Sequence, residues 1–401
     1  MKEIVILGAG YAGLKALRRL QADKGDFHVT LVDRNDYHYE ATDLHEVAAG
    51  TQSREKITFP IADVIKPSTT FEKAEVKLID RKKQRVQLNN GKNLAYDYLI
   101  VSLGFRSESF GIAGVAENAL EMVDVASAEN VNRHIIEQMK NYAKTKSQDN
   151  LRIVVCGAGF TGIELLGALE DNRKKFAAIA GVEPEKLEFY CVEAVTRLLP
   201  MFDEKLANYG ISALKNWGIK FLTGKPIKEI KPNTVVYQDN KETGETKELS
   251  AKTIIWTTGV SGSQVMEASG FSQRRGRVMV SADLTDPDFD NVYIIGDVSA
   301  VMNTENNRPY PTTAQIALSM GEHAARNILA QLKGSATTPF TFKSLGSVAS
   351  MGNTHAFGLV GKSAVKGYPA SFVKKMIMDK SLLETGGIKE MLAKGRFDLY
   401  H

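Results

Sequence analysis

The 401-residue sequence is poor in cysteine, which bears on both redox chemistry and metal binding. Its two cysteines, Cys156 and Cys191, lie in separate apolar runs, and neither belongs to a C-x-x-C pair. A redox-active disulfide and a paired-cysteine metal site are therefore disfavoured. We expect no bound metal and a reducing, cytoplasmic environment.

Long hydrophobic runs are also absent. No uninterrupted apolar run approaches the roughly 18–20 residues that a membrane-spanning helix needs. The first apolar run is reached by Ile4, so we expect no signal peptide. Hydrophobic residues make up 43% and charged residues 24% of the chain, which is ordinary for a folded core. The length predicts two or three domains, and we expect no nucleic acid among the partners.

Positive charge is concentrated at the C-terminus. Residues 362–401 contain eight basic and four acidic side chains, whereas the remaining residues contain 43 of each, so the whole net charge of +4 lies in this tail. The tail also has apolar residues at helical spacing: Phe372, Val373, Met376 and Ile377 beside Lys374 and Lys375, then Ile388, Met391 and Leu392. A basic amphipathic helix predicts an anchor on an anionic membrane surface. The alternative is a helix packed on the protein's own core or in a dimer.

What the sequence does contain is two copies of one phosphate-binding motif. The first is Gly8-Ala9-Gly10-Tyr11-Ala12-Gly13, after the apolar run 4–7, and the second is Gly157-Ala158-Gly159-Phe160-Thr161-Gly162, after the run 153–155. The first glycine makes a tight turn, the second lets the backbone approach a pyrophosphate, and the third lets helix pack on strand. The anion then lies at a helix N-terminus. Two such motifs predict two bound nucleotides.

An acidic residue ends the strand that follows each motif. Asp33 stands 20 residues after Gly13, the spacing at which a carboxylate meets ribose hydroxyls. Glu193 stands 31 residues after Gly162, which predicts a longer crossover helix. A carboxylate here would repel a 2′-phosphate and favour NADH over NADPH, although Arg197 follows closely. The alternative for both acids is a strand end on the surface.

The remaining patterns predict an α/β fold with two Rossmann-like dinucleotide-binding domains, the second inserted in the first. Strands are expected at 75–79, 85–88, 96–101, 253–256 and 291–297, with a β-meander near 219–249 and helices at 127–144 and 312–332. Because 291–297 resembles a buried strand of the first unit, the first domain is expected to be discontinuous. We predict domains at 1–110 with 261–335, at 111–260, and a C-terminal amphipathic, membrane-associating region at 336–401.

Taken together, these features resemble the two-dinucleotide flavoproteins, and most closely the bacterial type II NADH:quinone oxidoreductases. The motifs behind the resemblance are Asp36-Tyr37-His38-Tyr39, Gly157-Ala158-Gly159-Phe160-Thr161-Gly162-Ile163-Glu164, Arg308-Pro309-Tyr310-Pro311-Thr312-Thr313-Ala314-Gln315-Ile316-Ala317 and Lys394-Gly395-Arg396-Phe397. The resemblance implies FAD in the first site and NADH in the second. It implies hydride transfer from NADH to FAD and then two electrons to a quinone, without proton pumping. The resemblance also implies a respiratory-chain enzyme that is a peripheral, monotopic protein on the cytoplasmic face of the cell membrane.

The resemblance also assigns roles to single residues. For FAD it adds Arg34, Val76, Gly104, Asp297, Ala314, Gln315 and Lys374 to the first motif and Asp33. For NADH it gives Gly157, Gly159, Gly162, Glu164, Glu193 and Gly259. Glu164, between nicotinamide and flavin, and Gln315, facing the quinone, are the catalytic candidates. Lys374 is expected near the quinone entrance and the flavin.

Simpler interpretations stay open for several of these residues. Glu164 could only complement a helix dipole, Gln315 could close a capping box on Thr312, Asp297 could cap a turn, and Val76 could be core. Three histidines are interpreted as structural rather than as a proton relay: His38, His45 and His134.

Other functions compete with this prediction. A soluble FAD-dependent NADH oxidase, a disulfide reductase or a sulfide:quinone reductase needs a cysteine near the flavin, and residues 40–46 contain none. A ferredoxin reductase stays open but leaves the amphipathic tail unexplained. The non-enzymatic alternative is an NADH-sensing flavoprotein, and a homodimer is also left open.

Overall fold

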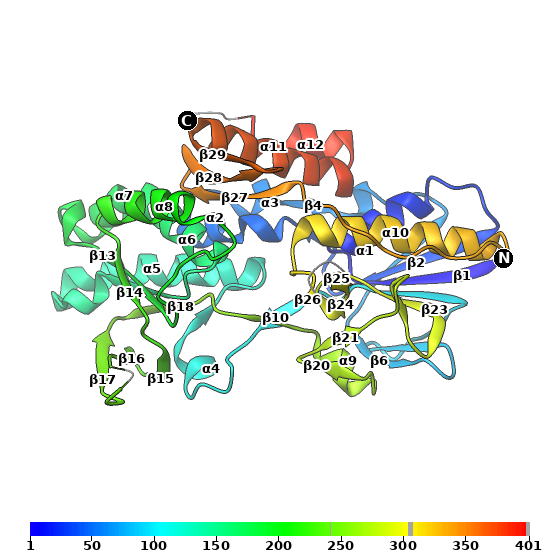
Figure 1. Ribbon diagram of the computed structural model, residues 1–401, viewed down its shortest axis with the longest axis horizontal. Helices are drawn as coiled ribbons and strands as arrows, with labels where there is room; N and C mark the ends of the chain where they lie inside the picture. Colours follow the sequence, from blue (N-terminus) through cyan, green and yellow to red (C-terminus); the bar gives the residue numbers. More distant parts are fainter. Residues whose placement is uncertain (241, 304–307, 398–401) are drawn as a thin grey trace.

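The computed structural model describes residues 1–240, 242–303 and 308–397, so Asp398 of the basic tail lies outside the described residues. Two lobes, each built on a largely parallel sheet, lie side by side, and the C-terminal elements lie across them at the top of Figure 1. This arrangement agrees with the predicted fold class of two dinucleotide-binding units.

The first lobe has a six-stranded sheet in the order β22-β23-β9-β1-β2-β5. Its strands are β1 (Lys2–Leu7), β2 (Phe27–Asp33), β5 (Thr69–Lys73), β9 (Tyr98–Val101), β22 (Thr285–Asp286) and β23 (Phe289–Ile294). β23 pairs in parallel with β9 although the second lobe lies between them in the sequence. The lobe is therefore assembled from two separate stretches of chain.

Both faces of this sheet are covered. On one face α1 (Tyr11–Leu20) packs closely against α10 (Ala314–Leu332). A Cβ at Gly321 would stand 2.2 Å from the carbonyl oxygen of Ala12, so only glycine permits this approach. The other face is covered by α9 (Gln264–Ala268) and a small sheet of β6 (Val76–Asp80), β7 (Arg85–Leu88) and β8 (Asn93–Ala95).

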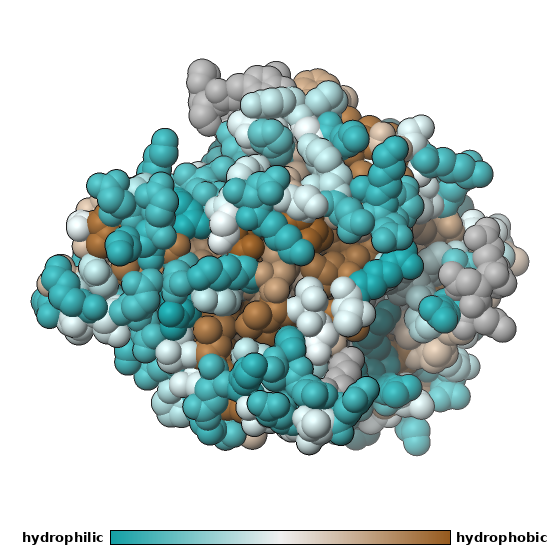
Figure 2. Space-filling view, turned by 60° about the vertical axis from the view of Figure 1, so that its left-hand side comes forward, coloured by the Kyte–Doolittle hydropathy of each residue, from teal (hydrophilic) through white to brown (hydrophobic). Residues whose placement is uncertain are grey.

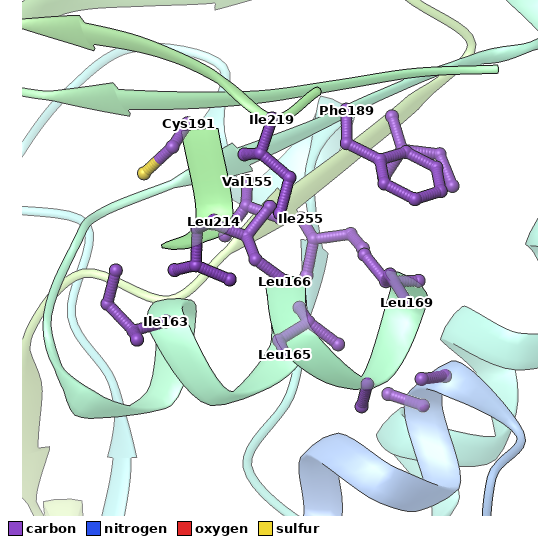
Figure 3. Close-up of a cluster of buried hydrophobic side chains, with 14 of the residues drawn as sticks. Val155, Ile163, Leu165, Leu166, Leu169, Phe189, Cys191, Leu214, Ile219 and Ile255 are labelled. Carbon is purple, nitrogen blue, oxygen red and sulfur yellow. The ribbon is translucent and has the colours of Figure 1, made fainter. Parts of the chain in front are cut away.

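The second lobe has a five-stranded parallel sheet in the order β11-β18-β12-β13-β14. Its strands are β11 (Leu120–Glu121), β12 (Arg152–Cys156), β13 (Glu188–Glu193), β14 (Lys220–Thr223) and β18 (Thr253–Trp256). Helices α5 (Val125–Thr145), α6 (Phe160–Asp171) and α8 (Glu204–Asn216) contribute to the core on one face. Figure 3 shows part of this buried cluster, to which Ile163 and Leu166 of α6 and Val155, Cys191 and Ile255 of the strands all belong.

Two details of the second lobe differ from the sequence prediction. The crossover after the second motif is not one longer helix but two, α6 and α7 (Arg173–Ala180), with Asn172 between them. The meander is limited to β15 (Ile227–Lys231), β16 (Thr234–Gln238) and β17 (Thr246–Ser250), because β14 joins the parallel sheet instead.

Two antiparallel strands connect the lobes: β10 (Phe105–Ser107) and β19 (Val260–Gly262). β10 runs between the lobes in Figure 1. The remaining short elements are β3 (Tyr37–Tyr39), α2 (Leu44–Ala49), α3 (Arg54–Ile57), β4 (Thr58–Pro60), α4 (Val115–Asn118), β20 (Gln273–Arg274), β21 (Arg277–Met279), β24 (Ser299–Ala300), β25 (Met302–Asn303) and β26 (Arg308–Pro309).

The C-terminal region is an antiparallel sheet followed by two helices. The sheet comprises β27 (Gly346–Met351), β28 (His355–Val360) and β29 (Ser363–Gly367), and the helices are α11 (Tyr368–Thr385) and α12 (Ile388–Lys394). Within the described part of the chain, no helix has both the length and the hydrophobicity to cross a membrane.

The tail differs from the predicted basic amphipathic helix in where its lysines point. Lys375 is buried, and Lys374 turns inward to Glu164 instead of lying beside the exposed face. Val373 and Met391 also pack inward. The exposed apolar residues of the two helices, called the apolar face below, are Tyr368, Phe372, Met376, Ile377, Leu383, Ile388 and Leu392.

Much of the tail's positive charge is neutralised within the protein. Lys380 pairs with Glu384 at 3.6 Å, Lys389 with Asp63 at 3.1 Å and Arg396 with Glu46 at 2.7 Å. The tail therefore presents its apolar side chains to solvent more strongly than its charge.

Candidate active site

The first glycine motif forms a tight turn between β1 and α1. Gly8 has φ +101°, and its N–H donates to the carbonyl of Val32 at 2.8 Å. A Cβ at Gly13 would stand 1.9 Å from the oxygen of Gly8, whereas a Cβ at Gly10 would meet no protein atom within 4 Å. The Gly10 position therefore faces open space at the N-terminus of α1, as approach by a pyrophosphate requires.

The second motif repeats this geometry. Gly157 has φ +108° and donates to the carbonyl of Val192 at 2.9 Å. A Cβ at Gly162 would stand 2.0 Å from the oxygen of Gly157, and a Cβ at Gly159 would again meet nothing within 4 Å. Two turns of one design thus open at the N-termini of α1 and α6.

The strand-end acids are tied to these turns. Asp33 accepts a hydrogen bond from the Ala9 N–H at 2.7 Å, and Glu193 accepts one from the Ala158 N–H at 2.8 Å. Neither acid is an exposed strand end, because both are half-buried. Arg197, which follows Glu193, donates to the carbonyl of Phe202 at 3.3 Å.

A cavity of about 450 Å³ opens beside the first turn. Of the predicted FAD residues, these line it: Gly8, Ala9, Gly10, Tyr11, Ala12, Asp33, Arg34, Val76, Gly104 and Asp297. The size, the open Gly10 position and the helix N-terminus fit an elongated dinucleotide with an anionic centre. Asp297 lines this cavity, and burial raises its pKa to about 6 against the opposing charge of Arg277.

Other lining residues were missed by the sequence reasoning. Phe105 and Arg106 come from the connecting strand β10, and Ser263, Gln264 and Val265 follow the returning strand β19. They carry no motif, since only the meeting of the two connections brings them to the cavity. The Arg34 side chain also reaches across to Asp124, 3.3 Å away at the start of α5.

A buried ion pair joins the second motif's helix to the C-terminal region. The Lys374 ammonium lies 2.8 Å from Oε1 of Glu164, which also accepts from the Ser350 N–H at 3.0 Å. Burial opposes ionisation of Glu164, but Lys374, His45 and the Ser350 N–H outweigh it and hold its pKa below the usual range. The attraction of Glu164 likewise holds the pKa of Lys374 above its usual value, despite burial. Sequence reasoning proposed both residues but for different ligands, and only the structure brings them together.

The histidines have local partners. His38 bonds the carbonyl of Ala9 at 2.8 Å, and His134 bonds the carbonyl of Lys252 at 2.8 Å. His45 lies 3.4 Å from the Ser350 hydroxyl, and burial lowers its pKa. In the parts of the chain that the structure describes, no cluster of three or more His, Cys, Asp and Glu side chains is arranged to hold a metal ion.

The start of α10 differs from the predicted capping box. Thr313, not Thr312, caps the helix, and its hydroxyl accepts from the Ile316 N–H at 3.3 Å. Gln315 instead accepts a hydrogen bond from the Leu345 N–H at 3.2 Å. Ala317, one turn further along α10, lines the cavity.

Gly259, predicted at the NADH site, has φ +69° at the end of the second sheet. A Cβ there would stand 2.3 Å from the ring of Phe110, which is half-exposed. The ring of Phe110 therefore covers this glycine.

In a space-filling view an apolar, recessed area lies at the centre of one face and is bordered by hydrophilic side chains (Figure 2).

Comparisons with known proteins agree with this geometry. The family model described as "Pyridine nucleotide-disulphide oxidoreductase" matches residues 2–321. The type II NADH:quinone oxidoreductase of Staphylococcus saprophyticus is 41% identical over 403 residues, covering 99% of each chain, and that of Staphylococcus aureus is 40% identical with the same coverage.

Solved structures share the fold. NDH2 from Plasmodium falciparum in complex with NADH superimposes with a TM-score of 0.88 at 18% identity, covering 98% of this chain and 97% of that one. The sulfide:quinone oxidoreductase from Aquifex aeolicus has a TM-score of 0.78 at 20% identity, covering 96% and 92%. The identities of 40–41% over full length show that the chain belongs to the type II NADH:quinone oxidoreductase family.

The description of the matched family names a disulfide, but the two cysteines of this chain are free thiols. Cys156 and Cys191 are both buried in β12 and β13 of the second lobe, and burial raises the pKa of each thiol. Among the described residues that line the first cavity there is no cysteine.

Proposed function

We propose that this protein is an FAD-dependent NADH:quinone oxidoreductase that works without proton pumping. The observation that carries the proposal is the pair of complete glycine turns, each with its own strand-end acid, in a chain 40–41% identical over full length to relatives of that name. FAD would accept a hydride from NADH and deliver two electrons to a quinone. The protein's task is then to hold, orient and tune these partners.

We place FAD in the first cavity and NADH at the second turn. Asp33 and Asp297 would bind the ribose and the ribityl chain, Val76 the adenine, and the N-terminus of α1 the pyrophosphate. Glu193 would bind the ribose of NADH, with Gly157, Gly159 and Gly162 at the pyrophosphate and Gly259 nearby. We propose that residues 1–110 and 261–335 form the FAD-binding domain, residues 111–260 the NADH-binding domain, and residues 336–401 the C-terminal region. The pairing of β23 with β9 supports the discontinuous first domain.

Glu164 and Lys374 are proposed to act where the two sites meet. Their ion pair spans from the helix of the NADH turn to the C-terminal region. Reduction of a quinone to a quinol consumes two protons, and NADH supplies a hydride, so one more proton must come from solvent. An ionised acid–base pair in a buried place suits both orientation of the nicotinamide and proton handling. Gln315 is proposed to face the quinone from α10.

Rapid reduction by NADH is the test of this function. Protein loaded with FAD should lose its visible flavin absorbance when NADH is added without oxygen, and a quinone should restore it. Like-charge contacts cost several kcal/mol, so NADPH, with its 2′-phosphate near Glu193, should react at least about tenfold more slowly. Stopped-flow absorbance measures both rates.

Two variants of β13 test whether Glu193 causes the preference for NADH over NADPH. Glu193→Gln should narrow the preference for NADH, whereas Glu188→Gln, at the other end of β13 beside Lys220 and Arg152, should leave it unchanged. Protein that binds no flavin, or that NADPH reduces as fast as NADH, would contradict the proposal. Reduction by NADH without reoxidation by any quinone would favour the sensing alternative.

We also propose that the apolar face of α11 and α12 attaches the protein to the cytoplasmic face of the cell membrane. Seven large apolar side chains exposed on two adjacent helices are more than scattered surface residues require. Because Lys380 and Lys389, beside this face, are paired with Glu384 and Asp63, apolar burial should contribute more to membrane binding than charge. A second copy of the chain covering the same face is the alternative.

The triple substitution Phe372→Ser, Met376→Ser and Ile377→Ser should therefore weaken binding to anionic liposomes by more than tenfold, since full burial of each side chain contributes about 1.5–3 kcal/mol. Charge reversal at Lys366 and Lys380 should have a smaller, salt-sensitive effect of about 1 kcal/mol per residue. Lys375 is unsuitable for this test because it is buried. Co-sedimentation measures the binding.

A matched control is Met279→Ser on β21, which is 49% exposed, compared with 55% for Met376. It should bind liposomes like the parent. If the triple variant also binds like the parent but changes from dimer to monomer, the apolar face is a dimer contact and the membrane proposal is wrong.

A further inference from the structure

The C-terminal end of α12 contacts α3 through two lysines. Lys394 donates to the carbonyl of Glu55 at 2.6 Å, and Lys56 donates to the carbonyl of Gly395 at 2.9 Å. Both lysine contacts lie at the edge of the protein. Arg396, two residues further, goes inward instead, and only 5% of it is exposed.

Arg396 has charged and polar partners on three elements. Its guanidinium lies 2.7 Å from Glu46 on α2 and donates to Asn353, after β27, at 3.2 Å. Its backbone N–H donates to Asp379 of α11 at 2.6 Å. A buried arginine with this many fixed contacts is held in place at a cost in desolvation, so a role for its charge should be sought nearby.

The neighbourhood of Glu46 is unusually rich in buried carboxyl groups. Glu40, Asp43 and Glu46 are each less than 10% exposed within seven residues of one another. Burial, followed by the charges of Glu46 and Glu40, raises the pKa of Asp43 well above its usual value. Any further uncompensated negative charge here would be costly.

This acidic cluster and the Glu164–Lys374 pair act on each other. A contact path joins them: His45, next to Glu46 on α2, lies 3.4 Å from the Ser350 hydroxyl, and the Ser350 N–H donates to Glu164 at 3.0 Å. Glu46 also attracts the Lys374 ammonium, in addition to its direct partner Glu164. The pKa of His45 is lowered mainly by burial and is also affected by the charges of Glu164, Glu46, Lys374 and Arg396. Glu46 therefore competes with Glu164 for Lys374, and Arg396 neutralises Glu46.

We propose that Arg396 is a positioning residue for the reaction: by neutralising Glu46, it leaves the Lys374 ammonium to Glu164. The inference rests on the proposed function for its consequence in turnover, but the effect on Glu164 itself is a property of the folded chain. Arg396 acts through Glu46 and Lys374.

Charged and polar groups face the two acids from several elements. Glu164 on α6 is faced by Lys374 from α11, His45 from α2 and Ser350 from β27. Glu46 is faced by Arg396, by Asp43 and by Asp171 from the end of α6. Without Arg396, the negative charge of Glu46 stays in the cluster, draws Lys374 and disfavours ionisation of Glu164.

The first test is Arg396→Gln. Loss of a neutralising cation from a buried cluster of charges shifts the pKa of a neighbouring acid by up to about one unit, so the acid limb of the pH profile of kcat/KM should move upward by up to about one pH unit. The ionisation of Glu164 is also read without turnover, by infrared titration of protein labelled with 13C-glutamate, in which Glu164→Gln identifies the band. Both readouts should move together.

Removing the charge that Arg396 neutralises should reverse the effect. The double variant Glu46→Gln, Arg396→Gln should return the infrared titration of Glu164 to within a few tenths of a unit of the parent, and Glu46→Gln alone should shift it downward. Lys394→Gln, which loses a cation from the same tail, is the control and should not change it. If Arg396→Gln does not fold, the direction of the Glu164 titration shift in Glu46→Gln still tests the proposal.

An unchanged Glu164 titration in Arg396→Gln overturns the inference, as does a double variant that keeps the shift of the single one, because Arg396 would then only fasten the tail. A shifted titration in a protein that does not oxidise NADH with quinone upholds the electrostatic role and contradicts the proposed function instead. The two failures are thus distinguishable.

Discussion

Replacing Lys374 with methionine is expected to lower the free energy of unfolding at pH 7 by about 3–5 kcal/mol, because it leaves the buried Glu164 carboxylate without its cation. NADH:quinone turnover should fall by roughly 100-fold, the usual contribution of a positioned acid–base group. Thermal unfolding and steady-state kinetics measure the two effects. The ion pair is nearly buried, with side-chain exposures of 12% and 8%, so solvent screening reduces neither effect much.

The stability difference between the parent and Lys374→Met should depend on pH. In the parent the pKa of Glu164 lies below its usual value, so the pair's stabilisation is present at neutral pH and is lost as pH falls through that pKa. In Lys374→Met, burial raises the pKa of Glu164 instead, and its penalty is relieved as pH falls. The stability gap between the two proteins should therefore narrow on acidification.

Two further variants identify the cause. Glu164→Gln combined with Lys374→Met should recover most of the stability, because no charge is left buried, but not the turnover. Lys380→Met on the same helix removes an exposed pair with Glu384 and should change stability by less than about 0.5 kcal/mol. A Lys374→Met protein with parental stability at every pH would disprove the buried-pair account.

Two glycines three residues apart should respond to alanine in opposite ways. Gly159→Ala is expected to fold like the parent, since the added Cβ meets no protein atom within 4 Å. It should nevertheless weaken NADH binding about 10- to 100-fold, because a displaced pyrophosphate loses a charge-assisted hydrogen bond of about 1.5–3 kcal/mol. Equilibrium titration with NADH and thermal unfolding separate the two quantities.

Gly162→Ala should instead destabilise the protein. Its Cβ would stand 2.0 Å from the backbone oxygen of Gly157, and backbone cannot move aside as a side chain can, so the loss should reach or exceed the about 1–3 kcal/mol of ordinary overpacking. Gly10→Ala and Gly13→Ala should repeat the pattern for FAD in the first lobe. If Gly159→Ala binds NADH normally, the pyrophosphate does not pass this turn.

The duplicated nucleotide units could be predicted from the sequence because their signals are local. A tight turn needs glycine at Gly8 and Gly157, helix packing needs it at Gly13 and Gly162, and each strand end carries an acid. In each unit the glycines and the acid lie within about 35 residues of one another, so their spacing in the sequence is enough to identify the unit. The same local logic failed at α10, where Thr312 and Thr313 are both competent caps and only the path of the preceding chain selects Thr313.

Long-range pairing could not be predicted in this way. Glu164 and Lys374 are 210 residues apart and Glu46 and Arg396 are 350 apart, and no local pattern states that a basic tail will neutralise acids of the first and second lobes. Net charge suggested a cationic surface, but ion pairing turned Lys374 and Arg396 inward and left the apolar face outside. The sequence by itself determined two nucleotide turns and their order, since turn and helix chemistry is local. Only the tertiary structure decided which charges meet, because burial makes an unpaired charge costly and so selects partners across the whole chain.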